Sequence, residues 1–78
     1  PPLAAPRPPT PMMNIIVNGD PRAVAPGLTA AQLVELLELG GHRLAMEINR
    51  EILPRSRYAE HALRDGDRIE IVQAIGGG

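Results

Sequence analysis

The sequence predicts an α+β fold in which one helix covers one face of a mixed sheet of about five strands. The chain has 78 residues, which is enough for one small domain. Several short stretches alternate apolar and polar residues with the period of a half-buried strand, and turn sequences separate them. A single stretch, after Pro26-Gly27, has the apolar spacing of a helix, so this helix must cover the sheet.

The first part of the chain predicts a leader followed by a hairpin. Residues 1–12 are rich in proline and show no hydrophobic period, so we expect a disordered, polyproline-like leader ahead of a folded domain over residues 13–78. Residues 13–18 have the pattern of a first strand. Asn18-Gly19 follows, and both residues tolerate the positive φ of a tight hairpin turn. Residues 21–25 then form the returning strand, which Pro21 places at an edge of the sheet.

The helix is predicted to begin at Thr29 and to run for about ten residues. Thr29-Ala30-Ala31-Gln32 matches a capping box, in which Thr29 bonds forward and Gln32 reaches back. Gly40-Gly41 is expected to end the helix. The residues expected to face the sheet are Ala30, Leu33, Leu36 and Leu37.

The second half of the chain predicts three more strands. Residues 44–49 alternate, with Leu44, Met46 and Ile48 pointing inward, and a turn at 49–51 leads to a short edge strand that Pro54 stops. Residues 56–63 form an irregular crossover or a helical turn, with Ala62 and Leu63 packed under the sheet, and Asp65-Gly66-Asp67 makes a tight turn. We expect the last strand, residues 68–73, to lie centrally beside the first, with Ile69 and Ile71 inward. This is the β-grasp, or ubiquitin-like, architecture.

The composition argues against several classes of function. The chain has no cysteine and a net charge of −1, with no basic stripe, so neither a thiolate site nor nucleic-acid binding is expected. No apolar run approaches the roughly 20 residues that span a bilayer, and the leader lacks the apolar segment of a signal peptide. We therefore expect a cytoplasmic protein. His42 and His61 stand without further ligands at metal spacing, so we predict surface histidines, no metal site and no catalytic residue.

The tail is the most unusual part of the sequence. Ile75-Gly76-Gly77-Gly78 directly follows the last strand, and glycines without Cβ atoms form a thin backbone. Such a tail can enter a narrow opening, so that another protein reaches the carboxyl group of Gly78. The alternative is a frayed chain end or a cloning remnant, because disorder concentrates at termini.

One exposed patch is predicted beside this tail. If Ile15 and Val17 face the helix, alternation places Ile16 on the opposite face of the sheet. By the same rule, the third and last strands expose apolar residues on that face. We expect these residues to form an apolar patch on which partners dock. The patch consists of Ile16, Ala45, Val72 and Ala74.

Several segments resemble the ThiS family, the sulfur carrier proteins of bacterial thiamine biosynthesis. The specific one is Asn49-Arg50-Glu51-Ile52-Leu53-Pro54-Arg55-Ser56, whereas Asp65-Gly66-Asp67-Arg68 is shared by many ubiquitin-like carriers. The resemblance covers residues 13–78. The family's Gly-Gly end is matched by Gly77-Gly78, Gly76 is one glycine more, and the leader has no counterpart.

This resemblance implies a carrier that is not itself an enzyme and binds no cofactor. A ubiquitin-activating-like adenylyltransferase would adenylate Gly78 with ATP and Mg²⁺, and a sulfur donor would convert the product to a thiocarboxylate. The loaded carrier would then give its sulfur to thiazole synthase. Two alternatives remain open: the small subunit of molybdopterin synthase, which is typically longer and richer in Phe, and a ubiquitin-like modifier or interaction module that never carries sulfur.

Overall fold

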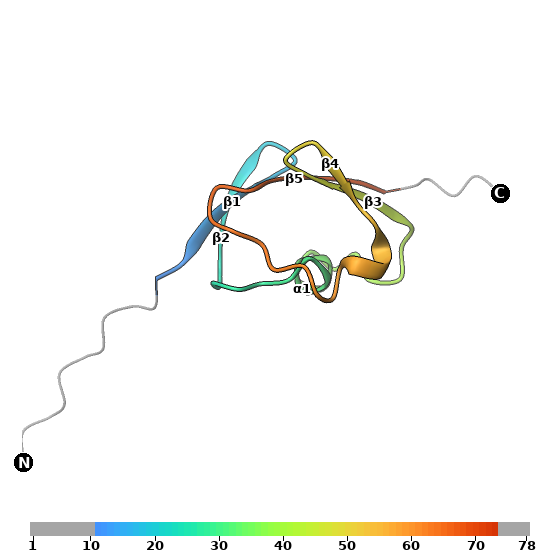
Figure 1. Ribbon diagram of the computed structural model, residues 1–78, viewed down its shortest axis with the longest axis horizontal. Helices are drawn as coiled ribbons and strands as arrows, with labels where there is room; N and C mark the ends of the chain where they lie inside the picture. The colour runs from blue at the N-terminus through green and yellow to red at the C-terminus, as the bar shows by residue number, and fades with distance from the viewer. Residues whose placement is uncertain (1–10, 74–78) are drawn as a thin grey trace, which may run out of the picture.

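The computed structural model describes residues 11–73, which form one mixed sheet with a helix across one face (Figure 1). The strand order is β2-β1-β5-β3-β4, with β5 parallel to β1 and antiparallel to β3. The predicted α+β, β-grasp fold with a central last strand is confirmed. The elements are β1 (Met13–Val17), β2 (Asp20–Val24), α1 (Ala30–Leu36), β3 (Leu44–Ile48), β4 (Glu51–Leu53), the 3-10 turn η1 (Arg55–Arg57) and β5 (Arg68–Gln73).

Both hairpins close through two-residue turns of type I′, in which both central residues have positive φ. In the first turn Asn18 has φ 50° and Gly19 has φ 86°, as predicted from the Asn-Gly pair. In the second turn Asn49 has φ 52° and Arg50 has φ 70°. Glu51 was expected in this turn, but it pairs with Ile48 and starts β4. The second turn is thus tighter than predicted.

The helix begins as predicted and ends earlier. Thr29 caps α1, and the capping box with Gln32 is complete. The helix stops at Leu36, seven residues long, and not at Gly40-Gly41. Glu38 adopts a left-handed φ of 60°, and the Leu39 N–H donates to the Val34 carbonyl at 2.9 Å. This is a Schellman ending in which glutamate occupies the position that glycine usually takes.

The core lies between the sheet and α1 and is aliphatic apart from Tyr58, which is 7% exposed. Leu36 was expected in this core but is 52% exposed. At 100° per residue it points well away from the direction shared by Ala30 and Leu33, both fully buried, so the core side of α1 is narrower than predicted. The fully buried large side chains are Ile15, Leu33, Met46 and Ile69.

The crossover from β4 to β5 packs along the start of the helix. The Ala30 N–H donates to the His61 carbonyl at 2.9 Å, and the Leu63 N–H donates to the Leu28 carbonyl at 2.8 Å. Leu63 is buried, as predicted, whereas Ala62 is exposed and forms a bridge to Thr29. Within residues 11–73, no helix is long and apolar enough to cross a membrane.

Candidate functional site

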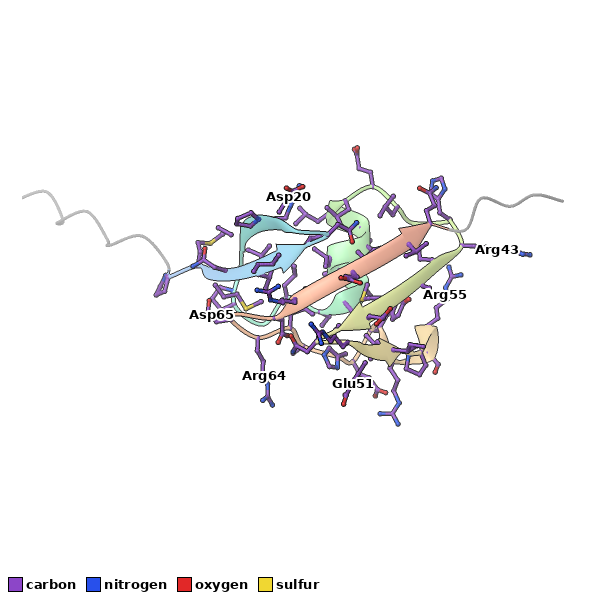
Figure 2. All side chains as sticks on the ribbon, turned by 90° about the horizontal axis from the view of Figure 1, so that it is seen from above. Asp20, Arg43, Glu51, Arg55, Arg64 and Asp65 are labelled. Atoms are coloured by element: carbon purple, nitrogen blue, oxygen red, sulfur yellow. The ribbon has the colours of Figure 1, made fainter. Side chains whose placement is uncertain are left out.

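The predicted reactive end of the chain lies beyond the described residues. Gly78 and the other tail residues, Ile75, Gly76 and Gly77, follow the last described residue, Gln73, and so does Ala74 of the predicted docking patch. The structure therefore describes the part of the fold that precedes the tail. This part consists of the central strand β5, its two neighbouring strands and the sheet face opposite α1 (Figure 2).

The two turn asparagines hold β5 in place. The Asn18 side chain accepts a hydrogen bond from the Ile71 N–H at 2.8 Å and donates to the Ile71 carbonyl at 3.2 Å. The Asn49 side chain accepts from the Arg68 N–H at 3.0 Å. Asn18 thus supplies partners for the β5 backbone beyond the end of β1 at Val17, and Asn49 supplies one beyond the end of β3 at Ile48.

The turn before β5 is fixed by its two aspartates. The Asn14 N–H donates to the Asp65 carboxylate at 2.7 Å. The Asp67 carboxylate, which is 9% exposed, accepts from the Arg64 N–H at 2.8 Å and from the Asn49 side chain at 3.0 Å. Both carboxylates therefore stabilise the turn that the sequence predicts at Asp65-Gly66-Asp67.

The end of β5 contacts the loop before β3. Leu44 and Gln73 form the last pair between β3 and β5. The Gln73 side-chain amide lies 2.7 Å from Nδ1 of His42, an exposed histidine in that loop. The adjacent Arg43 lies at the same end of the sheet (Figure 2). His42 is thus a surface histidine, as predicted, with a structural contact that the sequence did not reveal.

The predicted docking patch is divided by the strand register. Ala45 and Val72 are direct cross-strand partners, and both are exposed on the face opposite α1. Ile16 is half-buried and is aligned with Arg68, four residues or about 13 Å along β5 from Val72. Glu70 lies between Arg68 and Val72 on that face. The prediction of one continuous patch at the tail is therefore wrong for Ile16, and the described part of the patch is the pair Ala45 and Val72.

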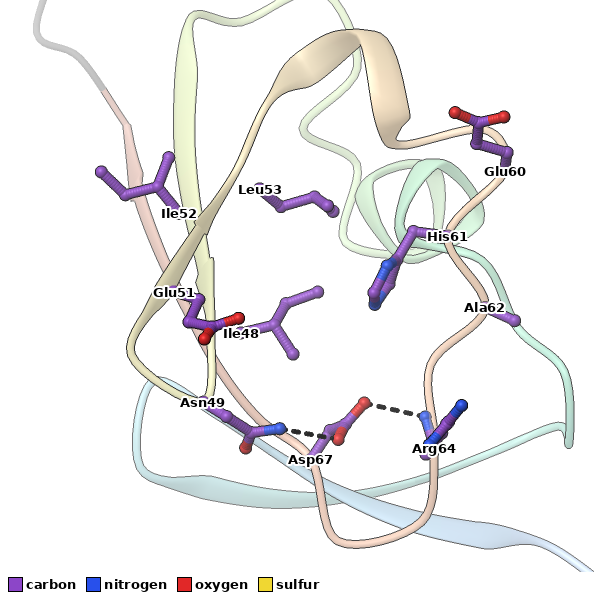
Figure 3. Close-up of a pocket in the computed structure, with 10 residues that line it drawn as sticks. All are labelled: Ile48, Asn49, Glu51, Ile52, Leu53, Glu60, His61, Ala62, Arg64 and Asp67. Atoms are coloured by element: carbon purple, nitrogen blue, oxygen red, sulfur yellow. Dashed lines mark hydrogen bonds between the residues drawn. The ribbon is translucent and has the colours of Figure 1, made fainter.

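A hollow of about 510 Å³ lies between β4 and the crossover (Figure 3). The His61 ring points into it, and Asp67 forms its floor with hydrogen bonds to Asn49 and Arg64. His61 is half-buried, so it is less exposed than the predicted surface histidine. In the described range, residues 11–73, no group of three or more His, Asp or Glu side chains could hold a metal ion.

The sequence does not predict the side-chain contacts that fix β5. It predicts turns at Asn18 and Asn49 and a strand end at Gln73, with no role for their side chains. The available signal was that both hairpin turns begin with asparagine, whose short amide can bond to backbone as well as adopt positive φ. Their partners lie 53 and 19 residues away along the chain, so only the fold identifies them.

Comparison with known proteins places these features in a family. The model of the ThiS family matches residues 15–78. The sulfur carrier protein ThiS of Escherichia coli is 38% identical over 66 residues, which cover 85% of this chain and 100% of that protein. The crystal structure of the thiamine biosynthesis protein ThiS from Geobacter metallireducens matches with a TM-score of 0.73 and 33% identity, over 85% of this chain and 100% of that one.

A longer relative also matches. Thiazole synthase of Paramagnetospirillum magneticum is 41% identical over 66 residues, which cover 85% of this chain. The chain spans only 20% of the length of that synthase. The matching stretch is therefore a minor part of the larger protein.

Proposed function

The chain belongs to the ThiS family, and from this premise we propose that it carries sulfur for thiamine biosynthesis on the carboxyl group of Gly78. The observation that carries the proposal is the match of the family model through residue 78, and the likeness to the E. coli sulfur carrier over the full length of that protein supports it. The central strand β5, held by Asn18 and Asn49, leads directly to the glycine tail. A domain of this family is a carrier and not a catalyst.

The proposed chemistry begins with activation of the carboxylate. An oxygen of the Gly78 carboxylate attacks the α-phosphorus of ATP, pyrophosphate leaves, and an acyl adenylate forms. Hydrosulfide then attacks the acyl carbon, AMP leaves with the bonding electrons, and a thiocarboxylate and a proton result. ATP and Mg²⁺ bind to the adenylating partner. The carrier supplies only the carboxylate and a tail whose residues Gly76 to Gly78 have no side chains to obstruct entry into a buried site.

The proposed partners are an adenylyltransferase of the ubiquitin-activating kind, a sulfur donor and thiazole synthase. The match to thiazole synthases of P. magneticum and Magnetococcus marinus supports the last of these, because a carrier-like stretch forms 20% of each. The same matches favour the thiazole pathway over molybdopterin synthesis. We place the reaction in the cytoplasm, where ATP is available to the activating enzyme.

The test is the intact mass of the chain after incubation with the adenylyltransferase of the same organism, ATP, Mg²⁺ and sulfide. We expect the mass to rise by the difference between one sulfur and one oxygen atom. The matched control is the same chain without Gly78, which should keep its mass because its carboxylate falls short of the acyl site. An unchanged mass with an enzyme that loads another carrier would contradict the proposal.

A further inference from the structure

We propose that His42 is a positioning residue for loading of the tail, because its imidazole fixes Gln73, the last residue of β5. This inference rests on the proposed function, in which the carboxyl group of Gly78 must reach the acyl site of a partner. The contact joins Nδ1 of His42 to the side-chain amide nitrogen of Gln73 at 2.7 Å. An amide nitrogen can only donate, so Nδ1 accepts, and the ring is held as the tautomer with its proton on Nε2.

On the β3 side, Gln73 lies at a position of the ladder that forms no backbone hydrogen bond. The Asn49 N–H donates to the Arg68 carbonyl at 2.7 Å, so these two residues mark a hydrogen-bonded position of the antiparallel ladder. Such positions alternate with positions that lack backbone bonds. Along the register, Val72 therefore lies in a bonded pair, whereas Leu44 and Gln73 do not. The last ladder bonds between β5 and β3 are those of Val72.

The other neighbour of β5 does not reach Gln73 either. β1 ends at Val17, and the Asn18 side chain then bonds to the backbone of Ile71. Among the described residues, no backbone hydrogen bond outside the ladders involves Gln73. The imidazole of His42 is thus the group of the described chain that holds the last residue of β5.

The loop that carries His42 is itself held at the end of α1. The Leu39 N–H donates to the Val34 carbonyl at 2.9 Å, and the His42 N–H donates to the Leu39 carbonyl at 3.2 Å. Leu39 and Val34 are partly buried against the core. Because these bonds fix the loop, placing the imidazole costs less conformational entropy than it would on a free loop. The contact thus links the end of the helix to the end of the central strand.

The position of Gln73 matters because few residues separate it from the reacting carbon. Five residues follow it, and five residues span at most about 18 Å. Without the His42 contact, the last residue that backbone bonds fix is Val72, so Gln73 moves and the carboxyl group of Gly78 is less often at the acyl site. Reaction rates fall when reacting atoms are displaced by about 1 Å. The contact should therefore act on turnover and not on binding of the carrier.

Two variants of His42 test the contact in ATP–pyrophosphate exchange catalysed by the adenylyltransferase of the same organism. His42→Phe keeps a planar ring but has no acceptor, whereas His42→Asn places an amide oxygen close to the position of Nδ1. We expect His42→Phe to lower kcat about threefold, because loss of one exposed hydrogen bond shifts an equilibrium by a factor of about two to ten. KM for the carrier and the melting temperature should not change, since the predicted docking patch and the core are intact. His42→Asn should restore most of the wild-type kcat.

A second pair of measurements separates positioning from a general loss of structure. Gln73→Leu should lower kcat as much as His42→Phe, and the double variant should lose no more, because both changes remove the same contact. The NMR order parameter of the Gln73 amide should fall from about 0.85 towards 0.6 in His42→Phe and recover in His42→Asn. The matched control is His61→Phe, the same change of ring in the crossover, which should alter neither kcat nor the order of Gln73.

Three results would overturn this inference alone, given a wild-type chain that is adenylated. The first is a kcat of His42→Phe equal to that of the wild type. The second is an order parameter of Gln73 that His42→Phe leaves unchanged, because His42 then does not hold the end of β5. The third is additive losses in the double variant, which would show that the two side chains act separately. A wild-type chain that is not adenylated overturns the proposed function together with the inference.

Discussion

Asn18 performs two tasks, and a substitution can separate them. Its backbone needs a positive φ of 50°, while its side chain bonds to both backbone groups of Ile71. Asn18→Gly keeps the turn and removes the two side-chain bonds. We expect the free energy of unfolding to fall by about 1–2 kcal/mol, because partly buried groups of Ile71 lose their partners. Urea unfolding measures this change.

Asn18→Asp provides the comparison for this prediction. An aspartate also tolerates the turn and keeps an acceptor for the Ile71 N–H, so its loss of stability should be smaller than that of Asn18→Gly. Equal stability of Asn18→Gly and the wild type would show that the side chain contributes nothing to holding β5. At the scale of single residues, the turn was predictable from Asn18-Gly19, but the bonds to Ile71 were not, because they join residues that only the fold brings together.

The segment that ends α1 contains one residue in an unfavourable backbone conformation. Glu38 adopts a φ of 60° at the position where Schellman endings favour glycine. A residue with a Cβ atom is strained there, so Glu38→Gly should raise the free energy of unfolding by about 1 kcal/mol. Glu35→Gly is the matched control within the helix and should lower stability by about the same amount. A Glu38→Gly variant that is less stable than the wild type would contradict this assignment.

The elements differ in how far the sequence predicts them. The strands were predictable because alternation in stretches such as 44–48 reports one buried face directly. The start of α1 was predictable because its capping box is local. The end of α1 was not predictable, because Gly40 and Gly41 are stronger sequence signals for a helix end than Glu38 is. The helix nevertheless ends at Leu36, and Glu38 adopts the left-handed conformation. Burial of Leu39 and Val34 against the core accompanies that earlier ending, and this packing is a tertiary effect.

For the whole molecule, the topology was easier to predict than the alignment of its strands. The position of β5 followed from the crossover that precedes it. The offset between β1 and β5 depends on bonds such as that from the Ile16 N–H to the Asp67 carbonyl at 2.9 Å, which no local pattern reveals. A wrong offset was enough to place Ile16 beside Val72 in the predicted docking patch. The faces of Ile16, Ala45 and Val72 were predicted correctly, but the position of Ile16 relative to β5 was not.

The two sides of the molecule should therefore respond differently to the same substitution. Val72 lies on the open face beside the tail and is 64% exposed, so Val72→Glu should leave the melting temperature nearly unchanged. Val72→Glu adds a carboxylate beside Glu70 and removes apolar surface from the predicted docking patch. We therefore expect KM for adenylation to rise at least about tenfold. Leu36→Glu, on the helix side at 52% exposure, is the matched control and should leave KM unchanged. If both variants change KM equally, docking does not distinguish the two faces, and the sheet does not direct the tail into its partner.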